Sequence, residues 1–200
     1  MALVSSSYHA ARTMTDAAAA LRALAPVAGA ARDAALSHFH ATWRHDPCVP
    51  AAWISQPACS CVVLTCARYS LCLRRLVLVK WFGVQAACAV DAAAAEALTS
   101  HADFSWRTPN MVYAAVCGFA RASYQGFHAA DGAGYAWLAD AVLRLDAANP
   151  QVAARAADAF TNWRKYDEKR QALMRAQLER MLAHPGLSPN VREIASKSLK

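Results

Sequence analysis

The chain has 200 residues, of which 56% are hydrophobic and 18% are charged, a composition that excludes a disordered protein and predicts a globular one. Its 21 lysines and arginines against 14 aspartates and glutamates give a formal net charge of +7, which permits an acidic partner without requiring one. Residues 1–8 lack a basic segment followed by an apolar run, so we expect no secretory signal and an intracellular, cytoplasmic protein.

Two helices are predicted near the N-terminus. Thr15 or Asp16 can cap a helix that continues to Leu24 and ends at Pro26. Residues 31–43 suit a second helix.

Residues 48–75 differ in composition from the rest of the chain, because this 28-residue window holds five of the seven cysteines. The five are Cys48, Cys59, Cys61, Cys66 and Cys72. Structural zinc sites usually use Cys-x-x-Cys pairs, and the window has no such pair and no histidine, aspartate or glutamate. We therefore expect no metal site in this window.

A membrane span must be considered for residues 48–67, which are uncharged over about the length that a bilayer-crossing helix needs. Pro50 and Pro57 interrupt the segment, and Arg68 follows it directly. The sequence therefore predicts no membrane contact.

In the second half of the chain, apolar residues recur at helical rather than alternating spacing. The predicted helical faces are Val112, Val116 and Phe119; Tyr135, Leu138, Val142 and Leu145; Val152, Ala156, Phe160 and Trp163; and Leu173, Met174, Leu178 and Met181 or Leu182. Because helical segments flank Gly132 and Gly134, these glycines predict a helix-to-helix turn rather than a dinucleotide-binding loop.

Three short segments resemble one another: 108–111 (TPNM), 149–152 (NPQV) and 188–191 (SPNV). Each places a hydrogen-bond acceptor at an N-cap and then a proline, whose missing N–H costs nothing there, so each predicts a helix start. The prolines, at 109, 150 and 189, are 41 and 39 residues apart, close to the repeat length of HEAT and armadillo arrays. The predicted fold is therefore all-α: a superhelical stack of antiparallel helix pairs, an α-solenoid, in a single domain over residues 1–200.

Catalytic motifs are missing from the chain. It contains no H-E-x-x-H, no G-x-S-x-G and no phosphate-binding loop. The closest histidines, His38 and His40, would point about 200° apart on a helix, so they cannot share a metal ion, and we expect structural roles for both.

Basic residues gather between positions 164 and 180. They are Arg164, Lys165, Lys169, Arg170, Arg175 and Arg180. Asp167, Glu168 and Glu179 alternate with them, which is typical of a solvated helix face. We expect no nucleic-acid partner, because no recognition module accompanies these charges.

Three longer segments carry a resemblance to a known family: 127–135 (FHAADGAGY), 149–155 (NPQVAAR) and 163–171 (WRKYDEKRQ). Shorter matching segments are 14–16 (MTD), 43–47 (WRHDP), 80–82 (KWF), 85–86 (QA) and 109–110 (PN). In this order, they resemble the C-terminal domain of the alanyl aminopeptidases (aminopeptidase N), zinc metallopeptidases of peptidase family M1, in its bacterial and plant-like branch. In that family this domain is a superhelix of paired helices.

The resemblance implies that the chain is a C-terminal fragment of a hydrolase that removes N-terminal residues from peptides. The family's H-E-x-x-H zinc site, G-x-M-E-N segment and transition-state tyrosine belong to an upstream domain, so we expect no catalytic residue, metal or cofactor in this chain and no activity of the chain alone. Zinc is implied only for the parent enzyme's missing catalytic domain. The implied partners are that catalytic domain, in the same polypeptide, and peptide substrates, whose access to the chamber the helical bowl restricts.

Gln151 and Arg155 match the glutamine and arginine that face the substrate chamber in this family. Their spacing of four places them on one helical face. An arginine there could pair with the carboxylate or carbonyl groups of a peptide. The alternative, that Arg155 is only a solvated side chain, stays open at this stage.

The chain departs from the family pattern at two kinds of position. Met111 and Tyr113 stand where the family usually has arginines, so the charge of those arginines is lost. Residues 48–75 interrupt the resemblance, and deleting them joins Pro47 to Leu76 in a continuous family-like run. We interpret this window as an unspliced intron or gene-model artefact, with a genuine surface loop as the alternative. Transcript reads that join codon 47 to codon 76 would support the artefact.

Two other functions compete with the enzyme fragment. A free-standing helical-repeat scaffold would bind a protein partner on its concave face. A basic nucleic-acid binder would show steep salt-dependent retention on polyanions, and we rank it last.

Overall fold

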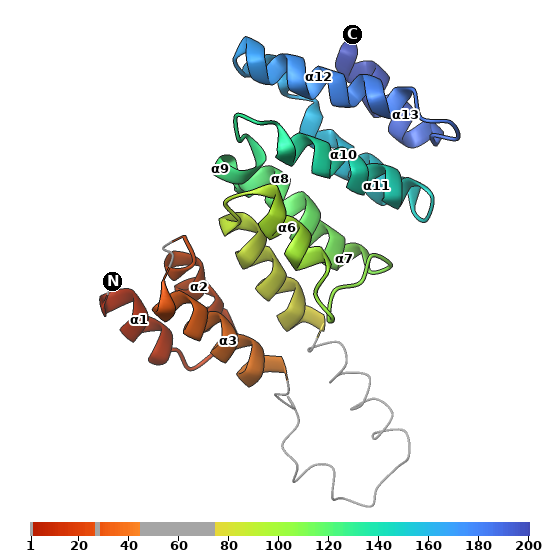
Figure 1. The fold of residues 1–200 in the computed structure, drawn as a ribbon. Helices are drawn as coiled ribbons and strands as arrows, with labels where there is room; N and C mark the ends of the chain where they lie inside the picture. Colours follow the sequence, from red (N-terminus) through yellow and green to blue (C-terminus); the bar gives the residue numbers. More distant parts are fainter. Residues whose placement is uncertain (1, 27–28, 45–74) are drawn as a thin grey trace, which may run out of the picture. The chain divides into compact units, whose positions relative to one another are not determined.

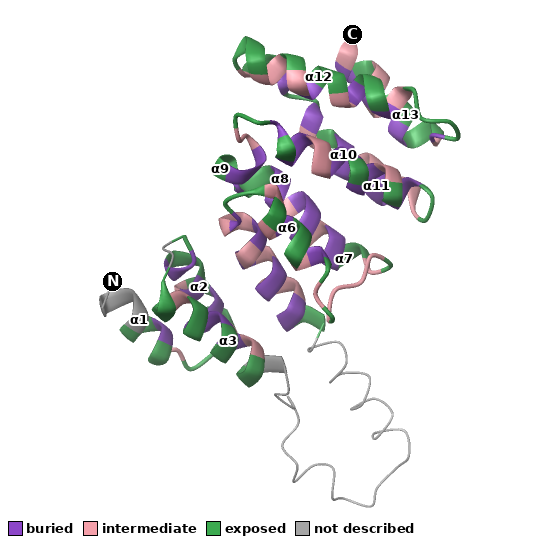
Figure 2. Ribbon diagram, in the orientation of Figure 1, coloured by how far each residue is buried: buried purple, intermediate pink, exposed green. Residues whose placement is uncertain are grey.

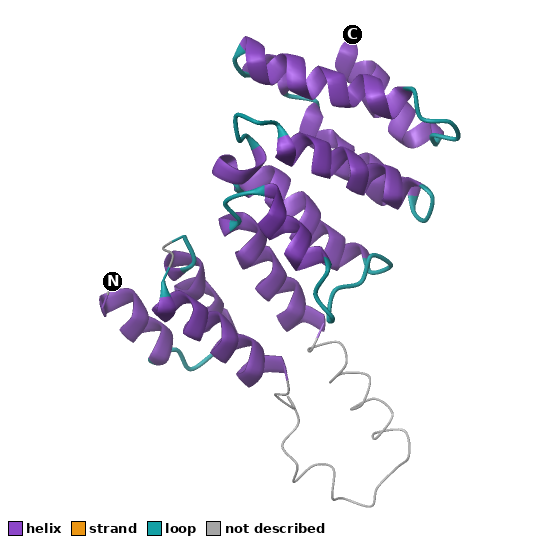
Figure 3. Ribbon diagram, viewed as in Figure 1, coloured by secondary structure: helices purple, strands orange, loops and turns teal. Residues whose placement is uncertain are grey.

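The computed structural model describes residues 2–26, 29–44 and 75–200 and divides the chain into two compact units, Met1–Val84 and Gln85–Lys200 (Figure 1). Every regular element among the described residues is helical (Figure 3), as the sequence predicts. The predicted insertion at 48–75 lies outside the described residues, apart from residue 75. In the described part of the chain, no helix combines the length and the apolar character that a membrane crossing would need.

The first unit contains α1 (Ala2–His9), α2 (Met14–Leu24), α3 (Ala30–Arg44) and the start of a helix at 75–88. The prediction of Thr15 or Asp16 as the cap of α2 is wrong: Thr13 is the N-cap, and its side chain accepts from the amide of Asp16. The Thr13 hydroxyl also donates to the Asp16 carboxylate at 2.7 Å, so the two residues bond to each other twice. The N-cap of α2 therefore lies two residues before Thr15.

The core of the first unit is apolar and aromatic. Leu21, Leu24, Phe39 and Phe82 are almost fully buried. Trp81, also buried, donates from Nε1 to the carbonyl oxygen of Leu36 at 3.1 Å, which ties the 75–88 helix to α3.

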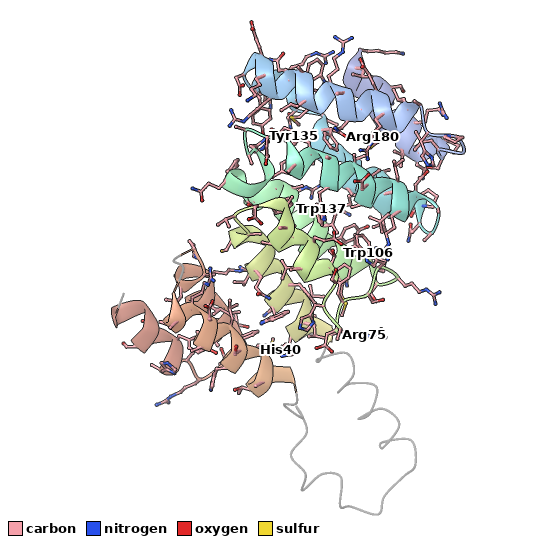
Figure 4. All side chains as sticks on the ribbon, in the orientation of Figure 1. His40, Arg75, Trp106, Tyr135, Trp137 and Arg180 are labelled. Carbon is pink, nitrogen blue, oxygen red and sulfur yellow. The ribbon has the colours of Figure 1, made fainter. Side chains whose placement is uncertain are left out.

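His38 and His40 lie on α3. His38 uses both ring nitrogens within the unit: Nδ1 lies 2.9 Å from the Tyr8 hydroxyl and Nε2 lies 3.3 Å from the Thr42 hydroxyl. The His40 ring, which is labelled in Figure 4, packs against the Trp81 ring, with their centroids 4.8 Å apart. These contacts are structural, as expected.

The second unit is a stack of helix pairs (Figure 1). Its elements are α6 (Ala92–Thr99), α7 (Pro109–Val112), the π-helix η1 (Tyr113–Cys117), α8 (Gly118–Ala122), α9 (Tyr124–Phe127), α10 (Ala133–Asp146), α11 (Pro150–Ala157), the 3₁₀-helices η2 (Asp158–Phe160) and η3 (Trp163–Lys165), α12 (Glu168–Leu182) and α13 (Pro189–Leu199). Helix α10 packs against α11, and α12 packs against α13. The α12–α13 pair stacks on the α10–α11 pair, because α10 also packs on α12 and α11 packs on α13.

The three predicted proline-marked helix starts are all present, with the proline in the first turn of α7, α11 and α13. Asn149 Oδ1 accepts from the amide of Val152 at 3.2 Å, and Ser188 Oγ accepts from the amide of Val191 at 3.4 Å. Thr108 differs, because its side chain makes no cap bond. Instead, its backbone carbonyl accepts from the amide of Met111 at 3.0 Å.

The predicted apolar faces are buried (Figure 2), except that Leu173 is only partly buried. Two of the faces do not lie on continuous α-helices. Helix α11 ends at Ala157, and the chain continues through the two 3₁₀-helices, which carry Phe160 and Trp163. Trp163 Nε1 donates to the carbonyl oxygen of Ser198 at 2.8 Å. This contact with α13, and not α-helical periodicity, positions the Trp163 side chain. The face formed by Val112, Val116 and Phe119 similarly contains the π-helix.

Gly132 lies in the predicted turn between α9 and α10, and Gly134 lies in the first turn of α10. Gly132 adopts φ +73°, a left-handed conformation that glycine tolerates well. A Cβ on Gly134 would lie 2.6 Å from the carbonyl oxygen of Phe127, so only glycine lets the start of α10 approach α9 this closely.

Buried polar side chains connect successive parts of the second unit. The Asp146 carboxylate, at the end of α10, accepts from the Ser188 amide at 2.8 Å and from the Ser188 hydroxyl. The Ser123 hydroxyl donates to the Ala89 carbonyl and accepts from the Gly126 amide. The bonds of Ser123 fix the start of α9, whose Tyr124 lines the hollows described below.

Candidate functional site

Gln151 and Arg155, the two residues predicted to face substrate, lie on α11. Pro150 in the first turn and the Asn149 cap begin this helix, so its first exposed turn carries Gln151. Both side chains are exposed, and their spacing of four residues places them on the same side of α11. The helix therefore presents an amide and a guanidinium group together to solvent.

The guanidinium of Arg155 lies over an aromatic ring. Its central carbon is 4.9 Å from the ring centroid of Tyr113, within the range of a cation–π interaction. Tyr113 is half-buried at the start of the π-helix, and the wider π turn is a local irregularity that often occurs at functional sites. The Tyr113 ring thus supports Arg155, whereas Met111 is buried in the core.

Arg121 extends this basic surface. Its Nη2 donates to the carbonyl oxygen of Arg155 at 3.4 Å and lies 3.6 Å from the carboxylate of Asp158, in a half-exposed ion pair. Burial raises the pKa of the nearby Cys117 thiol, while the charges of Arg121 and Arg155 oppose that rise. The buried thiol therefore stays protonated at neutral pH and does not supply a nucleophile.

Two hollows lie beside this surface. One, of about 300 Å³, includes Arg121 and Asp158 in its lining, and the other, of about 440 Å³, includes Arg170. The residues common to both linings are Tyr124, His128 and Tyr166.

His128 is held from several directions at the end of α9. Its Nδ1 lies 2.7 Å from the hydroxyl of Tyr135, which projects from α10 toward α12 (Figure 4). Its backbone carbonyl accepts from Arg170 Nε at 2.9 Å, and its ring lies 4.3 Å from the ring of Tyr166. The imidazole is therefore fixed between α10 and the start of α12.

The electrostatics around His128 keep its imidazole and the Tyr135 hydroxyl uncharged at neutral pH. Burial, and after it the positive charge of Arg170, lower the pKa of His128 from its ordinary value of 6.5, so the imidazole is neutral at neutral pH. Burial raises the pKa of Tyr135 to about 12, which keeps its hydroxyl protonated. The Arg170 side chain is paired with Asp167 at 2.7 Å, and its hydrogen bond lowers the pKa of that carboxyl.

A metal site is not formed by the residues that the structure describes, since no group of three or more histidine, cysteine, aspartate or glutamate side chains among them comes together. The chemistry available at this surface is hydrogen bonding from Gln151 and Arg155 and ring contact at Tyr124, His128 and Tyr166.

Comparison with known proteins identifies the family. Residues 1–69 and 67–200 match the family described as "Domain of unknown function (DUF3458_C) ARM repeats". The chain belongs to this ARM-repeat family. The assignment agrees with the predicted HEAT- or armadillo-like α-solenoid.

Relatives of this ARM-repeat chain are aminopeptidases. It is similar to the aminopeptidases N of Caulobacter vibrioides (40% identical over 194 residues, 96% of this chain), Haemophilus influenzae (32% over 200 residues, 99%) and Escherichia coli (31% over 199 residues, 98%). The match covers 19% to 20% of each relative, so the chain spans about one fifth of their length.

A solved structure gives the same result: the Legionella pneumophila aminopeptidase A, crystallised in complex with aspartic acid, matches with a TM-score of 0.75 and 30% identity, over 98% of this chain and 20% of that one. The resemblance to the aminopeptidase N family is therefore confirmed.

The sequence of this ARM-repeat chain predicts Gln151 and Arg155 on one helical face, and both are exposed on α11, but it does not predict the aromatic hollows. A signal was present, because His128 lies in the 127–135 segment and Tyr166 and Arg170 lie in the 163–171 segment. Nothing in the sequence alone showed that these two segments touch. Tyr124 belongs to neither segment, so only the structure brings it to the site.

Proposed function

We propose that this chain is the C-terminal helical domain of a zinc-dependent alanyl aminopeptidase that removes N-terminal residues from peptides, and that it lines the substrate chamber and restricts entry to it. The observation that carries the proposal is the 40% identity to an aminopeptidase N over 96% of this chain but 19% of that relative. The zinc site and the catalytic residues then belong to another domain of the same polypeptide. Its cellular location would be the cytoplasm, which fractionation would test.

Gln151 and Arg155 are the residues proposed to meet the peptide. The Arg155 guanidinium offers several N–H donors, and charge-assisted hydrogen bonds to a carboxylate or carbonyl are stronger than neutral ones. The Tyr113 ring limits the orientations of the guanidinium, so less conformational entropy is lost when a peptide binds. Gln151 adds one donor group and one acceptor on the same side of α11.

The first experiment uses the chain alone. Supplied with zinc, it should release no alanine from alanyl amide substrates, since the proposal places the catalytic site elsewhere in the polypeptide. Zinc-dependent turnover by the isolated chain would refute the proposal.

The second experiment tests the chamber role in a chimera. The corresponding fifth of the Caulobacter vibrioides aminopeptidase N is replaced by this chain, once with residues 48–75 and once without them. In an active chimera, Arg155→Met should raise KM for tripeptides about tenfold, the loss expected for a hydrogen bond to a charged group, and should leave KM for an alanyl amide nearly unchanged.

Arg192→Met is the matched control, because Arg192 is also an exposed arginine of the second unit. Equal KM changes for the tripeptide and the amide, or equal effects of the two variants, would contradict the chamber role and favour a scaffold. If only the version without 48–75 is active, the insertion is incompatible with the enzyme.

A further inference from the structure

The hollows beside Arg121 have the size of a ligand site. Their volumes, about 440 and 300 Å³, fall in the range of roughly 300–1,000 Å³ that is typical of small-molecule sites. Because both hollows include Tyr124, His128 and Tyr166 in their linings, these three rings form one surface that both hollows share. We call these three residues the ring cluster.

The ring cluster presents an open aromatic face. The planes of Tyr124 and His128 are nearly parallel, at 22°, with centroids 6.2 Å apart, and the His128 and Tyr166 planes make an angle of 31°. Tyr124 is 73% exposed, the largest value among the large hydrophobic residues that the structure describes as exposed. A further ring could therefore stack on Tyr124 and cover apolar area that now faces water.

The charges around the ring cluster are balanced. Arg121 lies 3.6 Å from Asp158, Arg170 lies 2.7 Å from Asp167, and the pKa of His128 is lowered so that its imidazole is neutral at neutral pH. A phosphate or an ammonium group would gain little here, because each fixed charge already has a partner of opposite sign. The surroundings favour an uncharged ring.

The ring cluster also offers a polar contact. Tyr135 occupies Nδ1 of His128, and no hydrogen bond from the described residues reaches its Nε2. A peptide backbone carries both donors and acceptors, so it can satisfy Nε2 in either imidazole tautomer. Arg121 links this region to the proposed chamber surface, since it lines the smaller hollow and donates to the Arg155 carbonyl.

We propose that the ring cluster of Tyr124, His128 and Tyr166 binds the uncharged aromatic side chain of a peptide. This inference rests on the proposed function only in naming a peptide as the source of the ring. It deepens that function by making aromatic peptides a preferred substrate class, with the aromatic residue lying in the hollow that Arg121 lines.

The test is a direct binding measurement on the 200-residue chain labelled with ¹³C-histidine. N-acetyl-phenylalaninamide is titrated while the ring signal of His128, assigned through a His128→Gln variant, is followed by NMR. The signal should shift to saturation. N-acetyl-cyclohexylalaninamide, which has a similar size but no π system, should bind roughly two- to tenfold more weakly, the range expected for an aromatic pair.

Two variants complete the experiment. Tyr124→Leu keeps an apolar side chain but loses the ring, and it should weaken binding of the phenylalanine amide by a similar factor. Leu76→Ser removes another exposed apolar side chain, in the first unit, and should leave the affinity unchanged. Because Tyr124 and Leu76 are both exposed, circular dichroism should show the helicity of the unaltered chain for both variants.

A His128 signal that does not move, equal affinities for the two amides, or an unchanged affinity in Tyr124→Leu would each overturn the proposal. None of these measurements requires turnover. Failure of the ring-cluster proposal can therefore be distinguished from failure of the chamber role, which is tested by KM in the Arg155→Met chimera.

Discussion

The two units of the chain hold their helices together in different ways. In the described part of Met1–Val84, the core consists of apolar and aromatic side chains such as Leu21 and Phe39. Among the described residues, the buried polar side chains apart from aromatic ones are Thr99, Ser123, Asp146 and Ser198, all in Gln85–Lys200. Hydrophobic burial is non-directional, whereas a buried hydrogen bond is costly to leave unmade. In the second unit, the bonds of Ser123 and Asp146 join separate segments and fix their register, whereas in the first unit the Trp81 indole makes the buried bond between helices.

Close packing of backbone against backbone also holds the helices of Gln85–Lys200 together. Cβ atoms built on Gly126 and Gly134 would lie 2.6 Å from the carbonyl oxygens of Ala89 and Phe127, respectively. These contacts lie beside the ring cluster, so the geometry of the proposed binding surface depends on them.

The largest expected effect comes from Gly134→Ala. The added Cβ would meet backbone atoms of Phe127, which cannot move aside as a side chain can, so we expect a loss of about 3 kcal/mol in the free energy of unfolding. Urea denaturation measures it. Gly118→Ala is the control, because a Cβ there would lie 3.5 Å from the Ala86 Cβ, an ordinary contact, and should add up to about 1 kcal/mol. Equal effects of the two substitutions would mean that close approach is not a determinant of this unit.

Asp146→Ala should have the next largest effect. The variant leaves the amide and hydroxyl of Ser188 without their buried acceptor, so we expect a loss of about 2 kcal/mol. The exposed Asp140, which is paired with Arg180, provides the comparison, and Asp140→Ala should cost less than about 1 kcal/mol. If the two substitutions lower the free energy of unfolding equally in urea denaturation, buried polar contacts do not distinguish the second unit.

Helix caps should contribute similarly in both units, because a cap is a local interaction. Thr13→Ala in the first unit and Asn149→Ala in the second should each cost about 1 kcal/mol, since each side chain accepts a hydrogen bond from a free amide. Thr108→Ala should change the free energy of unfolding by less than about 0.5 kcal/mol, because Thr108 makes no side-chain cap bond. A cost for Thr108→Ala equal to that of Asn149→Ala would show that the cap bond is not the cause.

The smallest effect is a pH dependence from His128. Its pKa in the folded chain is lowered from 6.5, so the unfolded chain binds the proton more tightly. The stability that this neutral histidine contributes is present above about pH 6.5 and is lost as the pH falls through the lower pKa of the folded chain. Between pH 7.5 and 5.0, the melting temperature of His128→Gln should therefore fall less than that of the unaltered chain. An NMR titration midpoint for His128 at or above 6.5 would contradict the prediction.

Periodicity predicted the helices and their buried faces well, because the spacing of apolar residues reflects the side of a helix that meets the core. Tyr135, Leu138, Val142 and Leu145 are all buried on α10, as expected. Periodicity did not predict that Phe160 and Trp163 lie on 3₁₀-helices. The reason is that this segment bonds to Ser198, which is distant in the sequence. The cap of α2 was missed for a related reason: Thr13, Thr15 and Asp16 are all capable caps, and the backbone conformation selects among them.

At the candidate site, local spacing along the chain predicts which side chains share a helical face. Gln151 and Arg155 share a face of α11 because they are four residues apart behind a proline start. The packing of the helices places the Tyr113 ring beneath Arg155. It also brings Tyr124, His128 and Tyr166, from three different segments, into the lining of the same hollows. The physical reason is that hydrogen-bonded helical turns form between near neighbours in the chain, whereas a hollow forms where packed helices bring distant side chains together.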